Sequence, residues 1–395
     1  MFHLKSDGTA LKPPLMPQTP GDVHTDCRNY SGYKPCGKSE QCPDCAHYAP
    51  RGTEILIIKL GAMGDVLRTK ALLSGLKAAH PTSSITWVTN PGSAEIVKDA
   101  RVDRVLELHP LIHLELAAKH FDLLISLDKE PVALGLSASI PAARKFGYAP
   151  TPSGTVGIWN AASEYAWRLG LSDELKYRHN RKTHLQLLYE MAELPYNGEE
   201  YELAVSPAEI DAVTHLIAHS GLNATAPRLG INTGCGEAFQ TKAWTPEGFA
   251  ASIERLLETT PYSILLLGGP REKEINSALA ERYQKSHPGR FFDTGTENTL
   301  PRFFAWVNAC DVLLSSDSLA MHVGIALKKR VVAFFGPTCE QEIDLFGRGE
   351  KWVTTYACSP CYLKTCTVRP SCMQAMPAEE ICAALERQLP LVGVR

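Results

Sequence analysis

Twice in this chain an apolar run of strand length ends in a glycine-rich turn, and this feature constrains the fold more than any other. The first run spans residues 55–60 and ends at Gly61, and the second spans 229–232 and ends in the turn 233–236. Continuous apolar runs of this length are typical of parallel strands that helices cover on both faces. Each run begins a series of alternating strands and helices, which predicts two doubly wound parallel α/β sheets in succession.

The other elements of each series are expected from the same patterns. In the first half, the sequence predicts a helix over residues 66–79 and strands over 84–89, 102–108, 123–127 and 145–148. In the second half, it predicts strands over residues 263–269, 311–315 and 330–335, and helices over 207–220, 244–260, 301–309, 319–327 and 377–389. The halves share this pattern but not their residues, which indicates two similar domains with a ligand cleft between them.

The overall composition excludes several classes of protein. The chain has 395 residues with 40 Lys and Arg against 43 Asp and Glu, so no domain-wide basic field for nucleic acid is expected. A mean hydropathy of −0.13 favours a folded protein, and no apolar run approaches the roughly 20 residues of a membrane helix. Residues 1–20 contain prolines and charges but no secretory hydrophobic segment. We therefore expect a disordered tail and a cytoplasmic protein with reduced thiols.

The first glycine-rich turn contains Gly61, Met63, Gly64 and Asp65. Its glycines let the backbone approach a ligand closely, and ligands of such sheets bind at the carboxyl ends of the strands. Asp65 has two interpretations. It either caps the following helix, whose first N–H groups favour a carboxylate, or it acts as a general base at the interdomain cleft.

The second glycine-rich turn begins with Thr233 and Gly234, and its N–H groups could hold an anionic group. Lys242 follows with a positive charge, together with the aromatic side chain of Trp244. A plain turn with a surface lysine is the alternative. Glu272 follows the strand expected over 263–269. A carboxylate at that position can accept hydrogen bonds from the hydroxyl groups of a ribose. The alternative is that Glu272 only begins a solvated helix.

Asp317, Ser318 and His322 occur where a later strand gives way to a helix. The N–H groups at that helix start would favour a diphosphate. His322 has an alternative role as a hydrogen-bonded histidine packed against the sheet. Neither half contains the full G-x-G-x-x-G fingerprint, which weakens the case for a nicotinamide dehydrogenase.

Five motifs, taken in order, resemble one family. They are Lys59–Leu67 (KLGAMGDVL), Lys242-Ala243-Trp244, Gly268–Glu272 (GGPRE), Asp317-Ser318 with His322, and Phe335–Thr338 (FGPT). This ordered set looks like the ADP-heptose:lipopolysaccharide heptosyltransferases of glycosyltransferase family 9, which are inverting enzymes of the GT-B fold. The resemblance covers residues 54–389. One departure is Leu319, where the family commonly has Gly.

The resemblance implies an α/β GT-B architecture, in which two Rossmann-like doubly wound parallel-sheet domains face a cleft behind a small N-terminal cysteine-rich extension. The expected parts are a disordered tail with the cysteine-rich metal-binding extension (1–50), the acceptor domain (51–205), the nucleotide-sugar donor domain (206–376) and a C-terminal helix (377–395).

The resemblance also implies roles for the loop residues. Asp65 would deprotonate the acceptor hydroxyl beside Gly61, Met63 and Gly64, which form the acceptor-side loop. Donor-binding residues would include Lys242 at the pyrophosphate and Glu272 at the ribose. The remaining donor-binding residues would be Thr233, Gly234, Asp317, Ser318 and His322. Helix N-termini and a basic side chain stabilise the leaving diphosphate in GT-B enzymes, so no catalytic metal is expected.

A segment rich in Gly and Pro near the N-terminus carries four cysteines but could scarcely build a core. A metal ion held by four thiolates would supply the missing folding free energy. We expect structural Zn²⁺, with iron or an iron–sulfur cluster as the alternative. Unrelated reduced thiols are another interpretation, and disulfides are disfavoured by the expected compartment. The four are Cys27, Cys36, Cys42 and Cys45.

A second group of cysteines lies between the last expected strand and the final helix. Related autotransporter heptosyltransferases bind iron through four cysteines, although the spacing here differs from theirs. Each set of four thiolates would complete the tetrahedral coordination of its own metal ion. We therefore expect two structural sites, with no open coordination position for metal catalysis. The second set is Cys358, Cys361, Cys366 and Cys372.

The sequence supports three hypotheses about function. The first is transfer of a heptose or similar sugar from an ADP-sugar donor to a lipopolysaccharide-core or related glycan. A lipid-linked acceptor would add a peripheral contact with the inner face of the cytoplasmic membrane. The second is a protein O-heptosyltransferase, which keeps the donor and changes the acceptor to a protein hydroxyl. The third is a metal- or redox-responsive binding protein on the same scaffold.

Overall fold

The computed structural model describes residues 21–39, 42–236 and 239–392, so the tail expected over residues 1–20 lies outside it. The chain separates into two compact units, one ending at Thr53 and the other beginning at Glu54. Over its described residues, the first unit has neither helix nor strand, apart from one isolated antiparallel bridge between Cys27 and Pro50. All further elements belong to the second unit, which is formed by two lobes.

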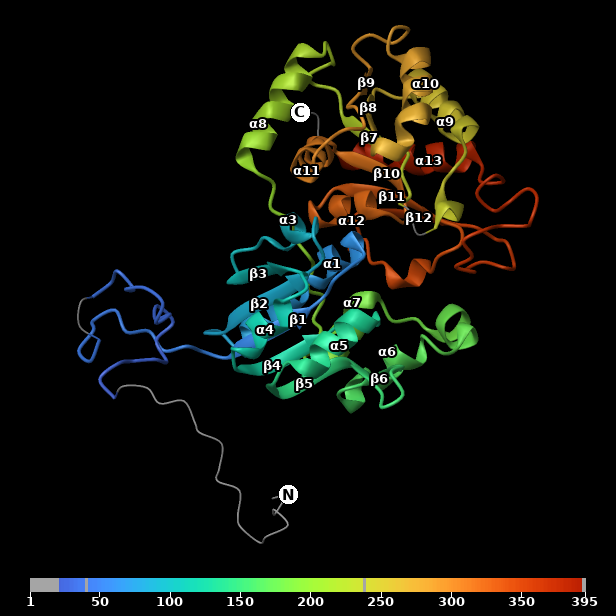
Figure 1. The fold of residues 1–395 in the computed structure, drawn as a ribbon. Coiled ribbons are helices and arrows are strands. Elements are labelled where there is room, and N and C mark those ends of the chain that lie inside the picture. The colour runs from blue at the N-terminus through green and yellow to red at the C-terminus, as the bar shows by residue number, and fades with distance from the viewer. Residues whose placement is uncertain (1–20, 40–41, 237–238, 393–395) are drawn as a thin grey trace. The chain divides into compact units, whose positions relative to one another are not determined.

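The N-terminal lobe is built on a six-stranded sheet in the order β3-β2-β1-β4-β5-β6 (Figure 1). Its pairs are parallel except for β5 and β6, which are antiparallel. The strands are β1 (Glu54–Ile58), β2 (Ser84–Thr89), β3 (Arg104–Glu107), β4 (Phe121–Ser126), β5 (Ala142–Pro150) and β6 (Val156–Ile158). The helices are α1 (Met63–Thr69), α2 (Leu72–Ala79), α3 (Ala94–Val97), α4 (Ile112–Ala117), α5 (Pro131–Ser139), α6 (Glu164–Arg168) and α7 (His184–Met191).

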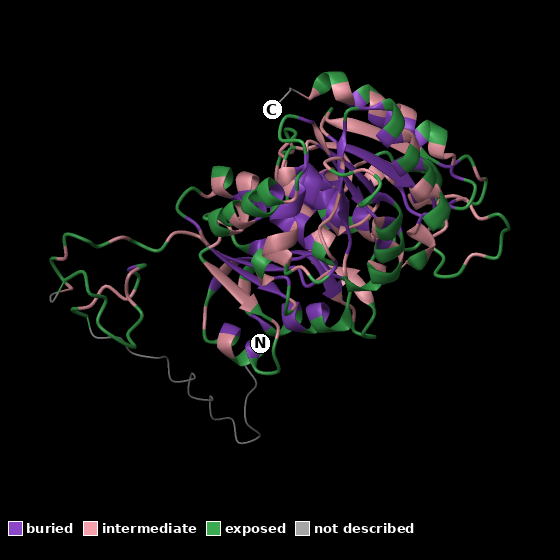
Figure 2. Cartoon of the chain, turned by 90° about the horizontal axis from the view of Figure 1, so that it is seen from above, coloured by how far each residue is buried: buried purple, intermediate pink, exposed green. Residues whose placement is uncertain are grey.

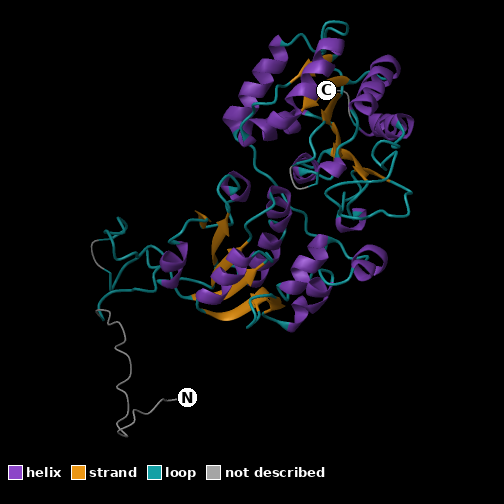
Figure 3. Ribbon diagram, turned by 45° about the vertical axis from the view of Figure 1, so that its right-hand side comes forward, coloured by secondary structure: helices purple, strands orange, loops and turns teal. Residues whose placement is uncertain are grey.

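The C-terminal lobe repeats the plan with a six-stranded, fully parallel sheet in the order β12-β11-β10-β7-β8-β9. The strands are β7 (Arg228–Asn232), β8 (Ser263–Leu267), β9 (Phe291–Asp293), β10 (Val312–Ser316), β11 (Arg330–Phe335) and β12 (Gly349–Val353). The helices are α8 (Pro207–His219), α9 (Pro246–Thr259), α10 (Lys273–Tyr283), α11 (Leu300–Ala309), α12 (Leu319–Ala326) and α13 (Ala378–Gln388). Figure 3 shows helices on both sides of each sheet.

Buried side chains explain why these runs form central strands. In β1, Ile55 and Ile57 join one hydrophobic cluster while Leu56 and Ile58 join another, so both faces of the strand are covered. Figure 2 shows the buried residues concentrated in the strands. The first cluster also includes Leu265 and Leu313 of the second sheet, so one core continues from lobe to lobe.

The predicted α/β class with two doubly wound parallel sheets is confirmed. Strands β6, β9 and β12 were not expected, because β6 and β9 have only three residues each and β12 lacks a buried apolar run. The prediction of a single helix over residues 66–79 is wrong in one detail, because two helices, α1 and α2, occupy this segment. Among the described residues, no helix combines the length and apolar character that a membrane crossing requires.

Candidate active site

The glycine-rich turn after β1 is fixed from within the N-terminal lobe by a buried ion pair. Lys59 pairs with Asp128, which follows β4, and its ammonium group also donates to the Gly61 carbonyl at 2.6 Å. The second carboxylate oxygen of Asp128 accepts the N–H of Leu60. Asp128 therefore determines where the turn lies, and it was not among the predicted site residues because it belongs to none of the motifs.

Asp65 lies in the first turn of α1, but it does not cap the helix, whose N-cap residue is Ala62. Its carboxylate instead lies 2.7 Å from the Arg68 guanidinium. Burial opposes ionisation, but Arg68 and then Lys59 outweigh it and hold the pKa of Asp65 well below its usual range. The side chain is 35% exposed, so part of it is open to solvent.

The acceptor-side loop meets the C-terminal lobe at Gly64. A Cβ atom on Gly64 would lie 2.5 Å from Cδ2 of His322, so only glycine allows α1 to approach α12 this closely. Gly61 lies in the turn near the Asn90 side chain, and Met63, two residues later, is 40% exposed. The three predicted loop residues thus lie where α1 begins.

His322 is buried between the lobes. Its Nδ1 lies 3.1 Å from the hydroxyl of Tyr201, a buried residue of the segment that connects the lobes. Burial and the nearby Arg68 lower the pKa of His322 to about 4. The ring is therefore neutral near pH 7 and acts as a hydrogen-bonding group, not as a cation.

Lys242 and Asp317 are next to His322. The Lys242 ammonium group donates to the Asp317 carbonyl and lies 3.7 Å from the carboxylate of the same residue. The other carboxylate oxygen lies 3.9 Å from Nε2 of His322. A continuous series of contacts therefore leads from the Asp65 turn through His322 to Lys242.

The start of α12 carries a polar cluster. Ser318 is the N-cap residue, but its hydroxyl bonds to the Ser315 hydroxyl at 2.9 Å and makes no capping bond. The side-chain amide of Asn232, the last residue of β7, donates to the Gly234 carbonyl at 2.7 Å. Ser316 donates to the same carbonyl at 3.2 Å. These bonds fix the carboxyl ends of β7 and β10 relative to each other.

Glu272 joins the turns that follow β7 and β8. Its carboxylate accepts the Gly269 N–H at 2.9 Å, and a Cβ on Gly234 would lie 3.1 Å from the carboxyl group. The Thr233 hydroxyl, by contrast, is buried and donates to Asn276 at 2.6 Å. The aromatic face expected from Trp244 is packed against Phe249 and Phe334, because the indole is part of the core.

Glu342 lies where the two lobes meet and is a candidate site residue that the motifs did not predict. Its side chain is 16% exposed and lies 3.9 Å from Lys176 of the N-terminal lobe. Burial raises the pKa of Glu342, and Arg68 and Lys176 oppose that rise. No signal of spacing or composition marks Glu342, because its partner lies 166 residues earlier and only the fold brings the two together.

The loop carrying the C-terminal cysteines bridges the two lobes. The Arg178 guanidinium donates to the carbonyls of Ala357 at 2.9 Å and Ser359 at 3.1 Å. The ring of Tyr362 stacks on Tyr177 with centroids 5.6 Å apart. Thr241, next to Lys242, donates to the Leu363 carbonyl at 2.7 Å. The loop thus contacts both the N-terminal lobe and the predicted donor side.

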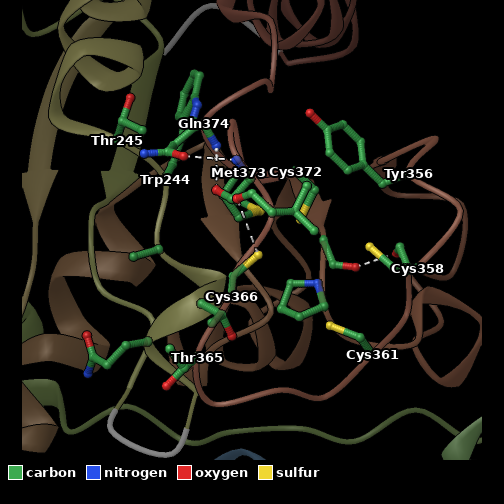
Figure 4. A pocket seen from close by; sticks show the side chains of 18 of the residues that line it. Trp244, Thr245, Tyr356, Cys358, Cys361, Thr365, Cys366, Cys372, Met373 and Gln374 are labelled. Atoms are coloured by element: carbon green, nitrogen blue, oxygen red, sulfur yellow. Dashed lines mark hydrogen bonds between the residues drawn. The ribbon is translucent and has the colours of Figure 1, made fainter.

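Four thiols of this loop line one cavity of about 450 Å³ (Figure 4). They are Cys358, Cys361, Cys366 and Cys372. Such a donor set suits a thiophilic metal ion. Within residues 21–39, 42–236 and 239–392, however, no three side chains of ligand type are gathered closely enough to hold one. A metal at these thiols therefore stays a prediction.

The chain is similar to known glycosyltransferases over most of its second unit. The sequence model of glycosyltransferase family 9 (heptosyltransferase) matches residues 112–371. Lipooligosaccharide heptosyltransferase 2 of Campylobacter jejuni is 27% identical over 165 residues, which are 40% of this chain and 50% of the relative. The match thus spans about half the length of that relative.

Two solved structures share the fold. A family 9 glycosyltransferase from Veillonella parvula has a TM-score of 0.67 at 18% identity, with 86% of this chain and 98% of that chain covered. The ADP-heptose LPS heptosyltransferase II of E. coli has a TM-score of 0.63 at 17% identity, with 86% and 99% covered.

Proposed function

Because the chain belongs to glycosyltransferase family 9, the heptosyltransferase family, we propose that it transfers a heptose or similar sugar from an ADP-sugar donor to a lipopolysaccharide-core or related glycan. The observation that carries this proposal is the series of contacts between the Asp65 turn of one lobe and Lys242 and Asp317 of the other. A donor on one side and an acceptor on the other would meet there.

The proposed reaction is a single displacement at the anomeric carbon. The Asp65 carboxylate takes the proton from an acceptor hydroxyl as the oxygen forms its bond to that carbon. The bond from the carbon to the diphosphate oxygen breaks on the opposite face, and ADP departs with the electron pair. The anomeric configuration inverts because attack and departure occur on opposite faces.

The residues on the donor side are suited to the negative charge that develops on the leaving diphosphate. Lys242 supplies a positive charge beside the start of α12, whose N–H groups point toward its N-terminal end. Glu272 offers a carboxylate to ribose hydroxyls, and the missing side chain of Gly234 leaves space for it. The ADP-heptose donor is proposed because the E. coli fold neighbour is named for it.

Turnover of a donor panel tests this function. The purified chain is incubated with a deacylated lipopolysaccharide core and either ADP-heptose, ADP-glucose or UDP-glucose, and released nucleotide is measured by chromatography. The proposal expects ADP release that depends on the acceptor, with little UDP release. A folded protein that neither binds nor turns over any ADP-sugar would contradict it.

A further inference from the structure

The described part of the first compact unit lacks what normally stabilises a small domain. Over residues 21–39 and 42–53 it has no helix or strand, and Cys27 is its only buried apolar residue. Folded units of fewer than about 70 residues usually need disulfides, a metal ion or a partner in addition to their core. Its cysteines are all free thiols. Another source of folding free energy is therefore required.

Backbone hydrogen bonds bring the two ends of this unit together. The N–H of Arg28 donates to the Ala49 carbonyl at 2.8 Å, and the N–H of Arg51 donates to the Asp26 carbonyl at 2.7 Å. The Arg51 guanidinium also donates to the Tyr30 carbonyl at 2.7 Å. Cys27 lies in the middle of these bonds, and its side chain is buried there.

Two tight turns carry three of the four thiols. Cys27 ends a turn that begins at His24, and Cys42 and Cys45 are the two ends of another. His24 joins the turns, because its N–H donates to Sγ of Cys42 at 3.3 Å and its Nε2 lies 3.1 Å from the Pro43 carbonyl. The C-x-x-C turn therefore lies beside the Cys27 turn.

The fourth thiol comes from the intervening loop. Sγ of Cys36 accepts the N–H of Lys38 at 3.5 Å. All four cysteines line a single cavity of about 720 Å³.

We propose that Cys27, Cys36, Cys42 and Cys45 bind one divalent thiophilic cation, Zn²⁺ or Fe²⁺, which fixes the fold of this unit. Four thiols lose their protons, and four sulfur–metal bonds form. In the described part of the chain no three ligand side chains stand close enough to hold an ion, so the loops must draw together on binding. The His24 ring is not proposed as a ligand, because it is stacked on Tyr48 at 4.3 Å and bonded to Pro43.

Metal content of the full chain tests this proposal. Protein purified without chelator is analysed for zinc and iron by mass spectrometry, with Cys42→Ser/Cys45→Ser as the test variant. Cys382→Ser, a buried thiol of α13, is the matched control, and Cys358→Ser/Cys361→Ser reports on the other cysteine loop. The test variant should lose one metal equivalent that Cys382→Ser keeps, and any equivalent lost by Cys358→Ser/Cys361→Ser belongs to the separate site predicted for that loop. Equal metal content in the test variant and the wild type would overturn the proposal.

Two further measurements keep the outcome unambiguous. Intact mass without reductant distinguishes metal from disulfides: a mass lower by four hydrogens, with no metal bound, would overturn the proposal. Hydrogen exchange of the full chain is then compared before and after chelation. Residues 21–53 should exchange faster without metal and recover when Zn²⁺ is added, while the strands of the second unit stay unchanged. Unchanged exchange in residues 21–53 would contradict the stabilising role.

Discussion

The Arg68 guanidinium lies 2.7 Å from the Asp65 carboxylate, one turn further along α1. Burial opposes the ionisation of both groups, but their mutual attraction outweighs it. The pKa of Asp65 is therefore lowered and the pKa of Arg68 is raised. A general base must be unprotonated before it can act, and Arg68 keeps Asp65 in that state at physiological pH.

The first prediction concerns Arg68→Met. Without the guanidinium, burial raises the pKa of Asp65, so kcat/KM should begin to fall at a higher pH as the solution is acidified. The wild type should show no such fall from Asp65 between about pH 5 and 8, because a lowered pKa lies below that window. Arg68→Lys is the control, since it keeps the charge. If kcat/KM fell at the same acidic pH in the Met and Lys variants, the charge of Arg68 would not control the ionisation of Asp65.

The second prediction concerns the stability contributed by neutral His322. Its pKa is about 4 in the folded chain against 6.5 for the ordinary side chain. Above pH 6.5 neither state binds the proton, so this residue causes no pH dependence. Between pH 6.5 and 4 only the unfolded state binds it, so stability falls as pH falls, by about 3 kcal/mol in total.

Denaturant unfolding of wild type and His322→Gln at several pH values checks this. Glutamine can still hydrogen-bond to Tyr201 but cannot titrate, so the variant should lose less stability between pH 6.5 and 4. Parallel pH profiles for the two proteins would mean that His322 is not the titrating group.

The third prediction concerns Asp128→Asn. The amide leaves Lys59 buried without its counterion, which should cost about 3 kcal/mol of unfolding free energy. Because Asp128 also holds Leu60, kcat should fall through misplacement of the Asp65 turn while the donor KM changes little. Glu95→Gln is the matched control, since its pair with Lys98 is exposed and worth less than about 1 kcal/mol. An equal loss in both variants would contradict the structural role of Asp128.

The fold was predictable because buried parallel strands have a strong local signal. Strand β2 and strand β11 have the residue bounds that the apolar runs predict, and both are buried over nearly their whole length. Strand β12, with the sequence GEKWV, has no such run. It forms because the neighbouring β11 supplies its hydrogen-bonding partners, which is a tertiary effect.

The candidate site was predictable where a residue belongs to a motif. Asp65, Lys242 and His322 were all found by motif, and the structure connects them through contacts between the lobes. Asp128 and Glu342 were missed because each depends on a partner far away in sequence. Sequence spacing also cannot tell whether a polar side chain is free for a ligand or already hydrogen-bonded inside the protein. The side chains of Asn232, Thr233 and Asn276 are examples, because all three are bonded internally.

The role of Asp65 is tested most directly by donor turnover in Asp65→Asn. Asparagine keeps the size of the side chain but cannot accept the proton, so kcat should fall by about 10²–10⁴-fold while the affinity for the ADP-sugar, measured by calorimetry, stays near that of the wild type. Wild-type turnover by the Asn variant would contradict the assignment of Asp65 as the base.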